Sequence, residues 1–464
     1  MTSTIAERTP AGRSSSPGPG PSRVQPPARA HPSVVWAVVV AGAVAVLALW
    51  WEDTPSLHGL GDWLTNAGRI TGLLAGYGVV VLVALMARIP VLERGIGADQ
   101  LALWHARGGR YTVTLIVAHA ALITWGYAVS AHTGIVHQSS TLLLSYPDVM
   151  MATVAGALLV GVGLVSARAA RRRMRYETWY YLHLYTYLAV ALAFSHQFST
   201  GADFVDKRAA RAAWSALYLA VGVALLWYRA FVPLRQAFRH RMRVESVLVE
   251  GPGVVSVVVA GRRVEELRAE AGQFFRWRFL TRDLWWASNP YSLSAAPLPG
   301  RIRITAKDLG SHSAALHRVR PGTRVFAEGP YGALTAGRRR RDKVLLIAGG
   351  IGITPLRALL QTLPARVGDI TLLYRVGADS DVVFRHEIEA IAKARGARVQ
   401  FLVGHRRDLG HDPLSAASLA ANIPALRDHD VFVCGPDAMA ESAVAALRLA
   451  KVPRRQIHHE SFTF

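Results

Sequence analysis

Long apolar stretches alternate with short polar links through the first half of the chain. Each stretch approaches the ~20 residues that a helix needs to cross a bilayer. The six candidate spans are Val34–Trp51, Ile70–Ala87, Leu103–Val129, Val149–Ala167, Trp179–Phe198 and Trp214–Val232. The pattern therefore predicts a six-span α-helical membrane bundle over residues 33–232.

The pattern changes after residue 240. Runs such as MRVESVLVEG and VVSVVVAG alternate or are rich in β-branched residues, as strands are, and turn residues separate them. Beyond residue 342 the strands KVLLIAG, DITLLYRV, RVQFLVG and DVFVCG alternate with helical segments. We therefore expect a region of β-strands over 240–336 and an α/β domain with a parallel sheet over 342–464.

Residues 1–32 differ from both halves. They are rich in Pro, Gly, Ser and Arg, a composition that cannot bury a core, and they predict a disordered tail. The apolar run that follows is long for the h-region of a signal peptide and fits a membrane span better.

Charge supports the membrane assignment. The net charge is +22, yet only 18% of residues are charged and 51% are hydrophobic. A soluble nucleic-acid-binding protein this basic would carry more charge in total, so we expect a lipid bilayer and no nucleic acid as partner. Arginines gather in the tail, after the second, fourth and sixth spans, which places both termini in the cytoplasm of a multi-pass plasma-membrane protein. Lys207, Arg208 and Arg211 in an outer link are exceptions.

Two basic runs, Arg171–Arg173 and Arg338–Arg341, fit a positive-inside loop and a solvated linker, with an anionic partner as the alternative.

Cys434 is the only cysteine, which excludes an intrachain disulfide, a multi-cysteine zinc site and an iron–sulfur cluster. Any redox cofactor must therefore be organic or be held by other residues, histidine above all.

Two candidate spans each contain two histidines. His105 and His119 are 14 residues apart in the third span, and His183 and His196 are 13 apart in the fifth. These spacings correspond to ~21 and ~20 Å along a helix. Ionisable residues within a bilayer are functional candidates, and imidazole is an axial ligand of haem iron. We therefore predict an inner haem at His105/His183 and an outer haem at His119/His196; the alternative is that all four only pack the bundle.

Helical phase supports this prediction only in part. Fourteen residues return to within ~40° of the same face, whereas thirteen miss by ~140°, so the fifth span needs a bend, a bulge or differently oriented haems. Arg69, at the outer edge of the second span, is a candidate for a haem propionate or an anionic oxygen species. An interfacial arginine that snorkels to water is the other interpretation.

The soluble half contains candidate flavin residues. In Asn289-Pro290-Tyr291-Ser292-Leu293 the tyrosine offers a flat face to an isoalloxazine ring and the serine a hydroxyl to its edge, although Pro-Tyr-Ser is also an ordinary turn. The next strand leads into a glycine turn at a helix start, which suits a pyrophosphate. Its candidate residues are Thr305, Lys307, Gly310 and Ser313.

A second glycine-rich loop follows a buried strand and opens a helix, as loops that bind dinucleotide pyrophosphates do. Its candidate residues are Gly349, Gly350, Gly352, Thr354 and Pro355. Arg375, helped by Arg385, is a candidate for a 2′-phosphate, which would favour NADPH; a surface arginine is the alternative. Cys434, Gly435 and Pro436 end a strand at the edge where ligands bind, and Phe464 is a terminal aromatic that covers a flavin or simply packs.

The order of these motifs resembles the ferredoxin–NADP reductase-type flavoproteins. Together with the histidine pairs, residues 33–464 resemble the ferric reductase and NADPH oxidase superfamily, whose members accommodate the same 14 and 13 spacings. The resemblance implies a β-barrel FAD-binding domain over 240–336 and an NAD(P)-binding domain over 342–464. It also implies FAD, NADPH or NADH, and two b-type haems as cofactors. It departs at Asn289, where related proteins usually have Arg or His beside the flavin, so the resemblance leaves the choice between FAD and FMN open.

The resemblance also implies a reaction. Ser292 and Thr354 would position the rings, Cys434 would lie near the nicotinamide and Phe464 would cover the flavin. Electrons would then pass by the inner and outer histidine pairs to a small-molecule acceptor outside. Ferric chelates are favoured, with oxygen reduction to superoxide or an extracytoplasmic protein partner as alternatives, and a non-enzymatic haem scaffold as the alternative of another class. The choice of NADH or NADPH and the oligomeric state stay open.

Overall fold

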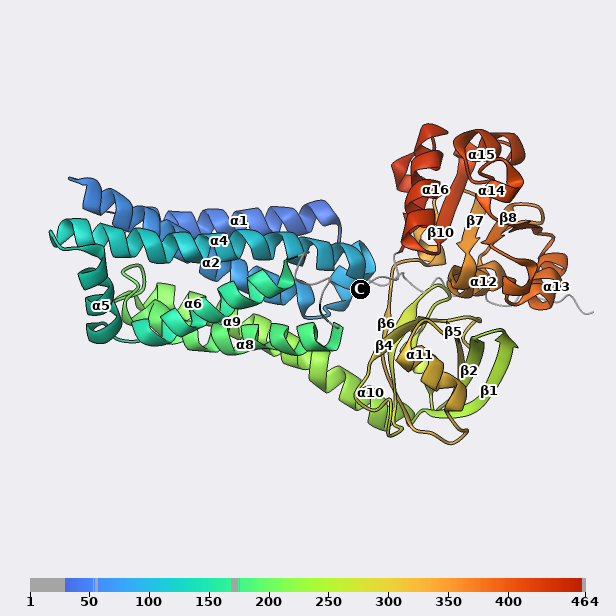
Figure 1. Cartoon of the computed structure of the whole chain (residues 1–464), viewed down its shortest axis with the longest axis horizontal. Helices are drawn as coiled ribbons and strands as arrows, with labels where there is room; N and C mark the ends of the chain where they lie inside the picture. The colour runs from blue at the N-terminus through green and yellow to red at the C-terminus, as the bar shows by residue number, and fades with distance from the viewer. Residues whose placement is uncertain (1–29, 53, 55–56, 168–173, 175, 461–464) are drawn as a thin grey trace, which may run out of the picture.

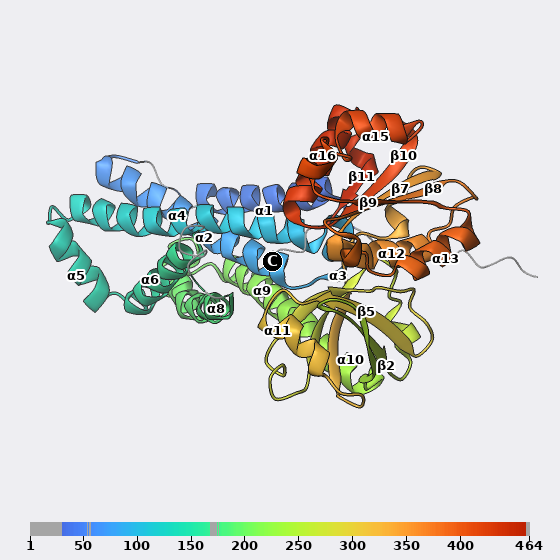
Figure 2. The ribbon, with the colours of Figure 1, turned by 45° about the vertical axis from the view of Figure 1, so that its right-hand side comes forward.

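The computed structural model describes residues 30–52, 54, 57–167, 174 and 176–460. Long helices run side by side along the long axis of the molecule and form its membrane half, and the two soluble domains lie at one end of them (Figures 1 and 2). The long helices are α1 (Pro32–Glu52), α2 (Leu60–Met86), α4 (Ala98–Ser130), α6 (Val149–Ser166), α8 (Tyr176–Ser199) and α9 (Arg208–Leu226).

Five helical segments of the described residues are long and apolar enough to cross a membrane. They are Pro32–Glu52, Leu60–Met86, Gln100–Ser130, Val149–Ser166 and Arg208–His240. The last joins α9 to the π-helical turn η1 (Trp227–Phe231) and to α10 (Val232–His240). The fifth predicted span forms α8, but its tyrosines and histidines make it more polar than the others, so the prediction of six spans is not confirmed.

Two short helices were not predicted. α3 (Pro90–Ile96) lies at the end of the bundle that faces the soluble half, and α5 (Ile135–Ser145) lies at the opposite end (Figure 2). Pro90 at the first turn starts α3, because proline has no N–H to leave unsatisfied there. Gly97, with φ of 98°, ends it in a conformation that favours glycine.

Small residues let α2 and α4 approach closely. A Cβ atom on Gly68 would lie 2.8 Å from Ile123 Cδ1, and one on Gly126 would lie 2.4 Å from the Thr65 hydroxyl. Such contacts let helix backbones pack at short range in a membrane, where the hydrophobic effect contributes little to helix association.

Two three-stranded antiparallel sheets form the first soluble domain. One has the order β1-β2-β5, with β1 (Arg243–Gly251), β2 (Val254–Ala260) and β5 (Arg301–Lys307), and the other the order β4-β3-β6, with β4 (Asn289–Ser292), β3 (Phe274–Phe279) and β6 (Val325–Tyr331). Alternate residues of both sheets, such as Phe275, Trp277 and Ile304, share one buried core. Isolated bridges join Leu293 to Ile304 and Arg243 to Arg324 at the sheet edges, and the short helix α11 (Ser311–Ala315) follows β5.

The second soluble domain is a parallel sheet covered by helices, as predicted. The strand order is β11-β10-β7-β8-β9, with β7 (Lys343–Gly349), β8 (Ile370–Val376), β9 (Arg398–Val403), β10 (His429–Cys434) and β11 (Ile457–His459). Val344 and Leu346 belong to one core with α12 (Ile353–Thr362) and α13 (Arg385–Arg395), whereas Leu345 and Ile347 belong to another with α15 (Ala416–Asn422) and α16 (Asp437–Leu449). This alternation follows from the period of two along a strand.

Short helical turns complete the described elements. They are α14 (Arg406–Leu409), η2 (Val264–Leu267), η3 (Leu316–Arg318), η4 (Ala336–Arg338), η5 (Gly350–Gly352), η6 (Asp379–Asp381), η7 (Leu426–Asp428) and η8 (Arg454–Gln456).

The link between α2 and α4 docks on the first soluble domain. Arg88, which follows the end of α2 with φ of 63°, forms a 3.0 Å ion pair with buried Glu93 and lies 4.7 Å above the ring of Tyr331 in β6. Ala98, the first residue of α4, packs with Phe274 and Tyr331. The start of α4 therefore rests on β3 and β6, in the same sheet as the candidate flavin strand β4.

Candidate functional site

The structure brings the four predicted histidines together in two pairs. The ring centroids of His105 in α4 and His183 in α8 are 5.8 Å apart, and those of His119 and His196 are 6.4 Å apart. Metal–imidazole bonds of about 2 Å place two rings on one metal about 6 Å apart between centroids, so both separations fit one metal atom. α8 is an unbroken α-helix through both of its histidines, so the 13-residue spacing is accommodated without a bulge.

Every one of these imidazoles has a partner at Nδ1. The acceptors in α2 are the carbonyl oxygens of Leu82 for His105, at 3.1 Å, and of Gly68 for His119, at 2.8 Å. Because a carbonyl oxygen only accepts, Nδ1 carries the proton in both rings and Nε2 keeps its lone pair for a metal. In α8, Nδ1 of His183 lies 3.5 Å from the Ser166 hydroxyl and that of His196 lies 3.0 Å from the Thr200 hydroxyl.

The number of ligands indicates what kind of metal group would fit. Among the described residues no group of three or more His, Cys, Asp or Glu side chains could hold a metal ion. Each histidine pair thus offers two ligands only, which suits a group that brings its remaining ligands with it, as a haem does. Gly72 of α2 leaves room for one of the rings, since a Cβ atom there would lie 2.5 Å from Nδ1 of His119.

Arg69 lies next to Gly68 and is already bound by other residues. Its guanidinium forms a 2.7 Å ion pair with buried Asp203 and donates to Asn66 at 3.1 Å. Asp203 stands in the link between α8 and α9, and sequence reasoning missed it because nothing in the pattern couples the two positions. A propionate or an anionic oxygen species would have to share this arginine with Asp203.

The glycine-rich loop between β7 and α12 packs against the end of β10. A Cβ atom on Gly352 would lie 2.3 Å from the carbonyl oxygen of Cys434, and one on Gly435 would lie 3.0 Å from the Cα of Gly349. Gly350 has φ of 49° and no atom within 4 Å of where its Cβ would be, so its face of the loop is open. These close approaches explain why the loop needs glycine, and they leave an open backbone face of the kind that binds pyrophosphates.

Polar side chains in this region bind the protein itself. The hydroxyl of Thr354 donates to the carbonyl of Ile351 at 3.0 Å, and Pro355 is buried in the first turn of α12. Cys434 is fully buried, and burial, with the nearby charge of Glu460, raises the pKa of its thiol well above the usual value. Its thiol is therefore a neutral, well-packed group, followed by Gly435 and by Pro436 at the start of α16.

The candidate flavin strand is β4. Ser292 is buried at its end, Leu293 is fully buried, and Pro290 pairs with Arg276 of β3. Tyr291 is half-buried, and burial raises the pKa of its phenol to about 12. The ring thus stays neutral at any working pH.

The turn after β5 is held by its own side chains. The N–H of Gly310 donates to Asp308, and the Ser313 hydroxyl accepts from the N–H of Leu309 at 2.9 Å and donates to the Gly310 carbonyl at 3.0 Å. Thr305 is buried and its hydroxyl lies within 2.8 Å of the hydroxyls of Ser256 and Ser294, so it links neighbouring segments of this domain.

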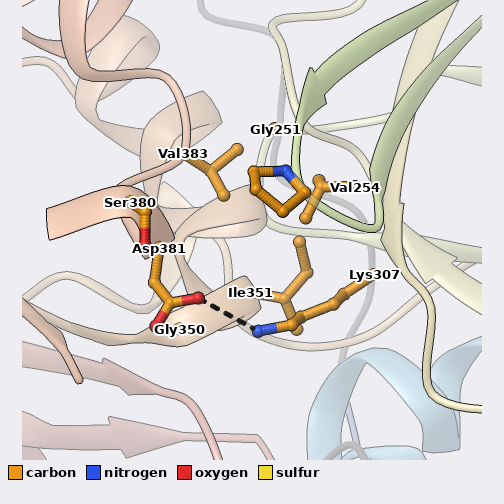
Figure 3. A pocket seen from close by; sticks show the side chains of 9 residues that line it. Gly251, Val254, Lys307, Gly350, Ile351, Ser380, Asp381 and Val383 are labelled. Carbon is orange, nitrogen blue, oxygen red and sulfur yellow. Dashed lines mark ion pairs between the residues drawn. The ribbon is translucent and has the colours of Figure 1, made fainter. Parts of the chain in front are cut away.

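Lys307 faces the nucleotide domain across a pocket. Its ammonium lies 3.6 Å from the carboxylate of Asp381, and the pocket between them is lined also by Gly350 and Ile351 of the glycine-rich loop and by Gly251 of the β1–β2 turn (Figure 3). The candidate pyrophosphate residues of the two soluble domains therefore meet at one place.

A second pocket lies where β8 and β9 end. It is lined by Arg375, His405, Arg407 and Asp408. Arg375 also donates to the carbonyl of Leu402 at 2.8 Å, whereas Arg385 pairs with Asp379 and does not line the pocket. Sequence reasoning missed His405 and Arg407, although an arginine pair just after a predicted strand was a usable signal.

Three of the predictions fall outside the described residues. They are Phe464, the basic run Arg171–Arg173 and residues 1–29 of the predicted tail. The other basic run is part of the fold, since Arg338 donates to the carbonyl of Gly95 in α3 at 3.1 Å and the backbone N–H groups of Arg340 and Arg341 donate to buried Asp430.

Known proteins match both halves of the chain. A family described as the ferric reductase like transmembrane component matches residues 71–194, and the oxidoreductase NAD-binding domain matches residues 346–445. The first match covers α4 and most of α8, and the second runs from β7 into α16. The chain thus joins a ferric reductase-like transmembrane component to an NAD-binding oxidoreductase domain, the combination that the resemblance implies. We call it the reductase from here on.

Individual relatives resemble the soluble half of the reductase. It is 30% identical over 202 residues to the ferredoxin reductase component of 3-ketosteroid-9-alpha-monooxygenase from Mycobacterium tuberculosis, covering 42% of this chain and 55% of that protein. It is 29% identical over 191 residues to ferredoxin–NADP reductase B of Sorangium cellulosum, covering 37% and 77%. The FAD/NAD-binding domain of a Vibrio cholerae nitric oxide dioxygenase is 25% identical with a TM-score of 0.40, covering 48% and 98%. The chain thus spans little more than half the length of the first relative.

Glu460 is a residue of the reductase that sequence reasoning missed. It follows β11, and its carboxylate accepts from the backbone N–H of Ala333 at 3.0 Å, just after β6. The same carboxylate contributes to the raised pKa of Cys434. Glu460 therefore ties the end of the nucleotide domain to the flavin domain beside the candidate nicotinamide site.

Proposed function

We propose that the reductase passes electrons from cytoplasmic NAD(P)H, through FAD and two b-type haems, to a ferric chelate on the outer side of the plasma membrane. The proposal is carried by one observation: two pairs of histidines face one another across α4 and α8. In His105 and His119, Nδ1 donates to a backbone carbonyl, so Nε2 can bind a metal. When bound, FAD would exchange one hydride for single electrons, and each haem would carry one electron.

The proposed topology treats α8 as a sixth span despite its polarity. Its histidines pair with those of α4, so α8 must lie at the same depth of the bilayer as a helix that is long and apolar enough to span it. Six spans and the arginine distribution then place both termini in the cytoplasm. The proposed domains are 1–32, 33–232, 240–336 and 342–464. The bridges Leu293–Ile304 and Arg243–Arg324 support treating the two sheets as one flavin-binding barrel.

The chain's own residues have distinct proposed tasks. His105 and His183 hold the inner haem, and His119 and His196 the outer one. Tyr291 and Ser292 with Pro290 and Leu293 form the flavin strand.

Pyrophosphates are proposed to bind at the pocket between the soluble domains. Lys307 and the backbone of the Gly349–Pro355 loop face one another there, and Gly310 and Ser313 shape the adjoining turn. Because Lys307 is held by Asp381 at 3.6 Å, an incoming phosphate has to compete with that carboxylate.

NADPH is the proposed hydride donor. The pocket at the ends of β8 and β9 has two arginines and one histidine against one aspartate, an excess of positive charge that suits a 2′-phosphate. Thr354, Cys434 and Gly435 lie on the other side of the sheet's carboxyl edge, where the nicotinamide is proposed to bind.

The test is an anaerobic difference spectrum of membranes that contain the full chain. NADPH should produce sharp low-spin b-type haem bands, and a ferric chelate outside the vesicles should reoxidise them. Replacing His119 or His196 by leucine should abolish transmembrane reduction and leave NADPH-dependent reduction of a soluble dye intact. Transmembrane reduction that survived both changes would overturn the proposed electron path through two haems. If oxygen accepted electrons and ferric chelates did not, the proposed acceptor would be wrong.

A further inference from the structure

A charged cluster with two largely buried arginines and a partly exposed glutamate joins the flavin domain to the nucleotide domain. Arg357 of α12 and Arg303 of β5 both bind the carboxylate of Glu387 in α13, with Nη2–Oε2 distances of 2.7 and 2.8 Å. Arg303 also donates to Oε1 at 2.8 Å, so its contact is bidentate. Arg303 belongs to the flavin domain and the other two residues to the nucleotide domain, so the cluster spans the seam between them.

Both arginines converge on the backbone of Ser294. Its carbonyl oxygen accepts from Arg357 at 3.1 Å and from Arg303 at 3.2 Å. Ser294 is fully buried and stands two residues after Ser292 of the candidate flavin strand. Gln361, one turn after Arg357, accepts from that arginine at 2.9 Å and from the N–H of Ala296 at 3.1 Å. Helix α12, which begins at the nucleotide loop, is thus fastened directly to the chain that leaves the flavin strand.

The cluster is a costly arrangement for stability alone. Two cations share one anion, and the buried Nε atoms of Arg303 and Arg357 have no hydrogen-bond partner. Burial lowers the pKa of the Arg357 guanidinium, and the hydrogen bond from Arg303 lowers the pKa of Glu387 below its usual range. Buried ion pairs of this kind stabilise less than apolar packing would, and a fixed geometry is what they provide instead.

We propose that Arg357 is a positioning residue for hydride transfer. It sets the orientation of the nucleotide loop relative to the flavin strand. The reaction moves one hydride, a proton with two electrons, from C4 of the reduced nicotinamide to N5 of the oxidised flavin. Its rate depends on sub-ångström placement of donor and acceptor. The inference rests on the proposed placement of flavin at Ser292 and of nicotinamide at the Gly349–Pro355 loop, and it does not depend on the haems.

The test compares variants of the full-length reductase in detergent. Arg357→Met keeps an unbranched apolar chain in place of the aliphatic stem of the arginine and removes its charge and hydrogen bonds. Flavin content should stay at the wild-type level and the KM for NADPH within about twofold, while the rate of flavin reduction in stopped flow falls roughly tenfold or more. The long-wavelength charge-transfer absorbance of the nicotinamide–flavin complex should weaken in parallel. Without nucleotide, the amide of Ala296 should exchange hydrogen at least tenfold faster.

Arg301→Met is the matched control. Arg301 lies on the same strand as Arg303, but it is exposed and pairs at the surface with Glu245 at 2.5 Å. This variant should reduce flavin at the wild-type rate. Arg357→Lys should recover part of the charge-transfer absorbance, because it restores the cation without the planar fork.

Other outcomes separate the possible failures. If Arg357→Met does not fold, Glu387→Gln, which keeps the shape of the side chain, takes its place with the same expected loss of rate. Wild-type flavin reduction and charge-transfer absorbance in the folded variant would overturn the positioning role. If Ser292→Ala instead leaves flavin content and reduction unchanged, the placement of the flavin is wrong, which is a failure of the proposed function.

Discussion

Arg407 lines the pocket at the ends of β8 and β9 together with Arg375 and His405. It is exposed, whereas Arg375 also holds the carbonyl of Leu402 and so maintains the strand ends. Arg407 is therefore the better residue for testing the choice of nucleotide. Arg407→Ala should raise the KM for NADPH roughly tenfold or more, since a hydrogen bond to a charged group contributes about 1.5–3 kcal/mol. The KM for NADH should not change.

The measurement is steady-state dye reduction with each nucleotide. Arg385→Ala is the informative comparison, because the guanidinium of Arg385 is bound to Asp379 and lies over the ring of Phe401. An equal rise of KM for NADH and NADPH in Arg407→Ala would show that the pocket does not bind a 2′-phosphate.

Cys434 is the second residue with a direct prediction. Burial and the charge of Glu460 raise the pKa of its thiol above the ordinary value near 9. The unfolded chain therefore loses this proton first as pH rises, and the free energy of unfolding should fall above about pH 9. In Cys434→Ala that slope should disappear, as measured by the thermal midpoint between pH 7 and pH 10. Iodoacetamide should label the native reductase at pH 8 far more slowly than the unfolded chain, and since this is the only cysteine the label reports on it alone.

At the scale of elements, helix α2 serves as a scaffold for the outer histidine of α4. Gly68 accepts from Nδ1 of His119, and Gly72, one turn later, leaves the space that the ring occupies. Gly72→Ala would place a methyl group 2.5 Å from that nitrogen, so the ring must turn and lose its hydrogen bond. We expect the dithionite-reduced b-type haem absorbance per protein to fall to roughly half, because one of two sites is lost.

Gly222→Ala is the control for this change. It makes the same substitution in α9, where nothing lies within 4 Å of the new atom. Helix propensity favours alanine at both positions, so a general effect on the helices would appear in both variants. Full haem absorbance in Gly72→Ala would mean that His119 does not need its anchor on α2.

The elements themselves were mostly predictable from the sequence, and the exceptions have physical causes. The lengths of the apolar stretches predicted α1, α2, α4 and α6, and runs of β-branched residues predicted the parallel strands. Burial of apolar side chains determines both patterns. α8 is more polar than the other spans because of its tyrosines and histidines, and the histidines face those of α4. The sequence also gives no sign of which way a hydroxyl points, so the contacts of Thr305 with Ser256 and Ser294 could not be predicted.

Contacts between distant segments were the part that the sequence could not reveal. Asp203 meets Arg69 across 134 positions, and Glu460 meets Ala333 across 127. Neither pair belongs to a local pattern, so only the folded chain brings them together. The histidine pairs could be predicted from the sequence for the opposite reason. Each pair of histidines lies within one span, and nearly the same spacing occurs on two spans.

At the scale of the whole molecule, the candidate sites follow one another along its long axis. The nucleotide loop meets the flavin domain at one pocket, and the flavin domain meets α4 at Ala98, where Phe274 pairs with Ser292 of the flavin strand. His105 stands seven residues after Ala98, about 10.5 Å along the helix and on nearly the same face. The junction between β6 and the α2–α4 link therefore determines how far the flavin strand lies from the inner histidine pair.

Arg88 is the residue that holds this junction. It occupies a left-handed conformation at the end of α2, where glycine is usual, so its side chain must compensate for the strain of its backbone. Arg88→Met removes the partner of Oε1 of buried Glu93. Its Oε2 has no hydrogen-bond partner in the wild type. Breaking a buried pair in this way costs about 3–5 kcal/mol, and the double variant Arg88→Met/Glu93→Gln avoids most of that cost. Both variants should lose the contact with Tyr331.

The expected result is uncoupling of the two halves. In both variants NADPH should reduce a soluble dye within about twofold of the wild-type rate, while NADPH-driven haem reduction slows roughly tenfold or more, since a shift of about 1 Å between reacting groups is enough for such a loss. Arg94→Met, in the same link but outside the contact with Tyr331, should change neither rate. The double variant restores stability without restoring the contact with Tyr331. Slow haem reduction in the double variant would therefore result from the lost docking contact and not from unfolding. If the double variant instead recovered the wild-type rate, the junction would only stabilise the fold, and the distance from flavin to haem would have to be maintained by α10, whose Gln236 donates to the carbonyl of Gly329 at 2.8 Å.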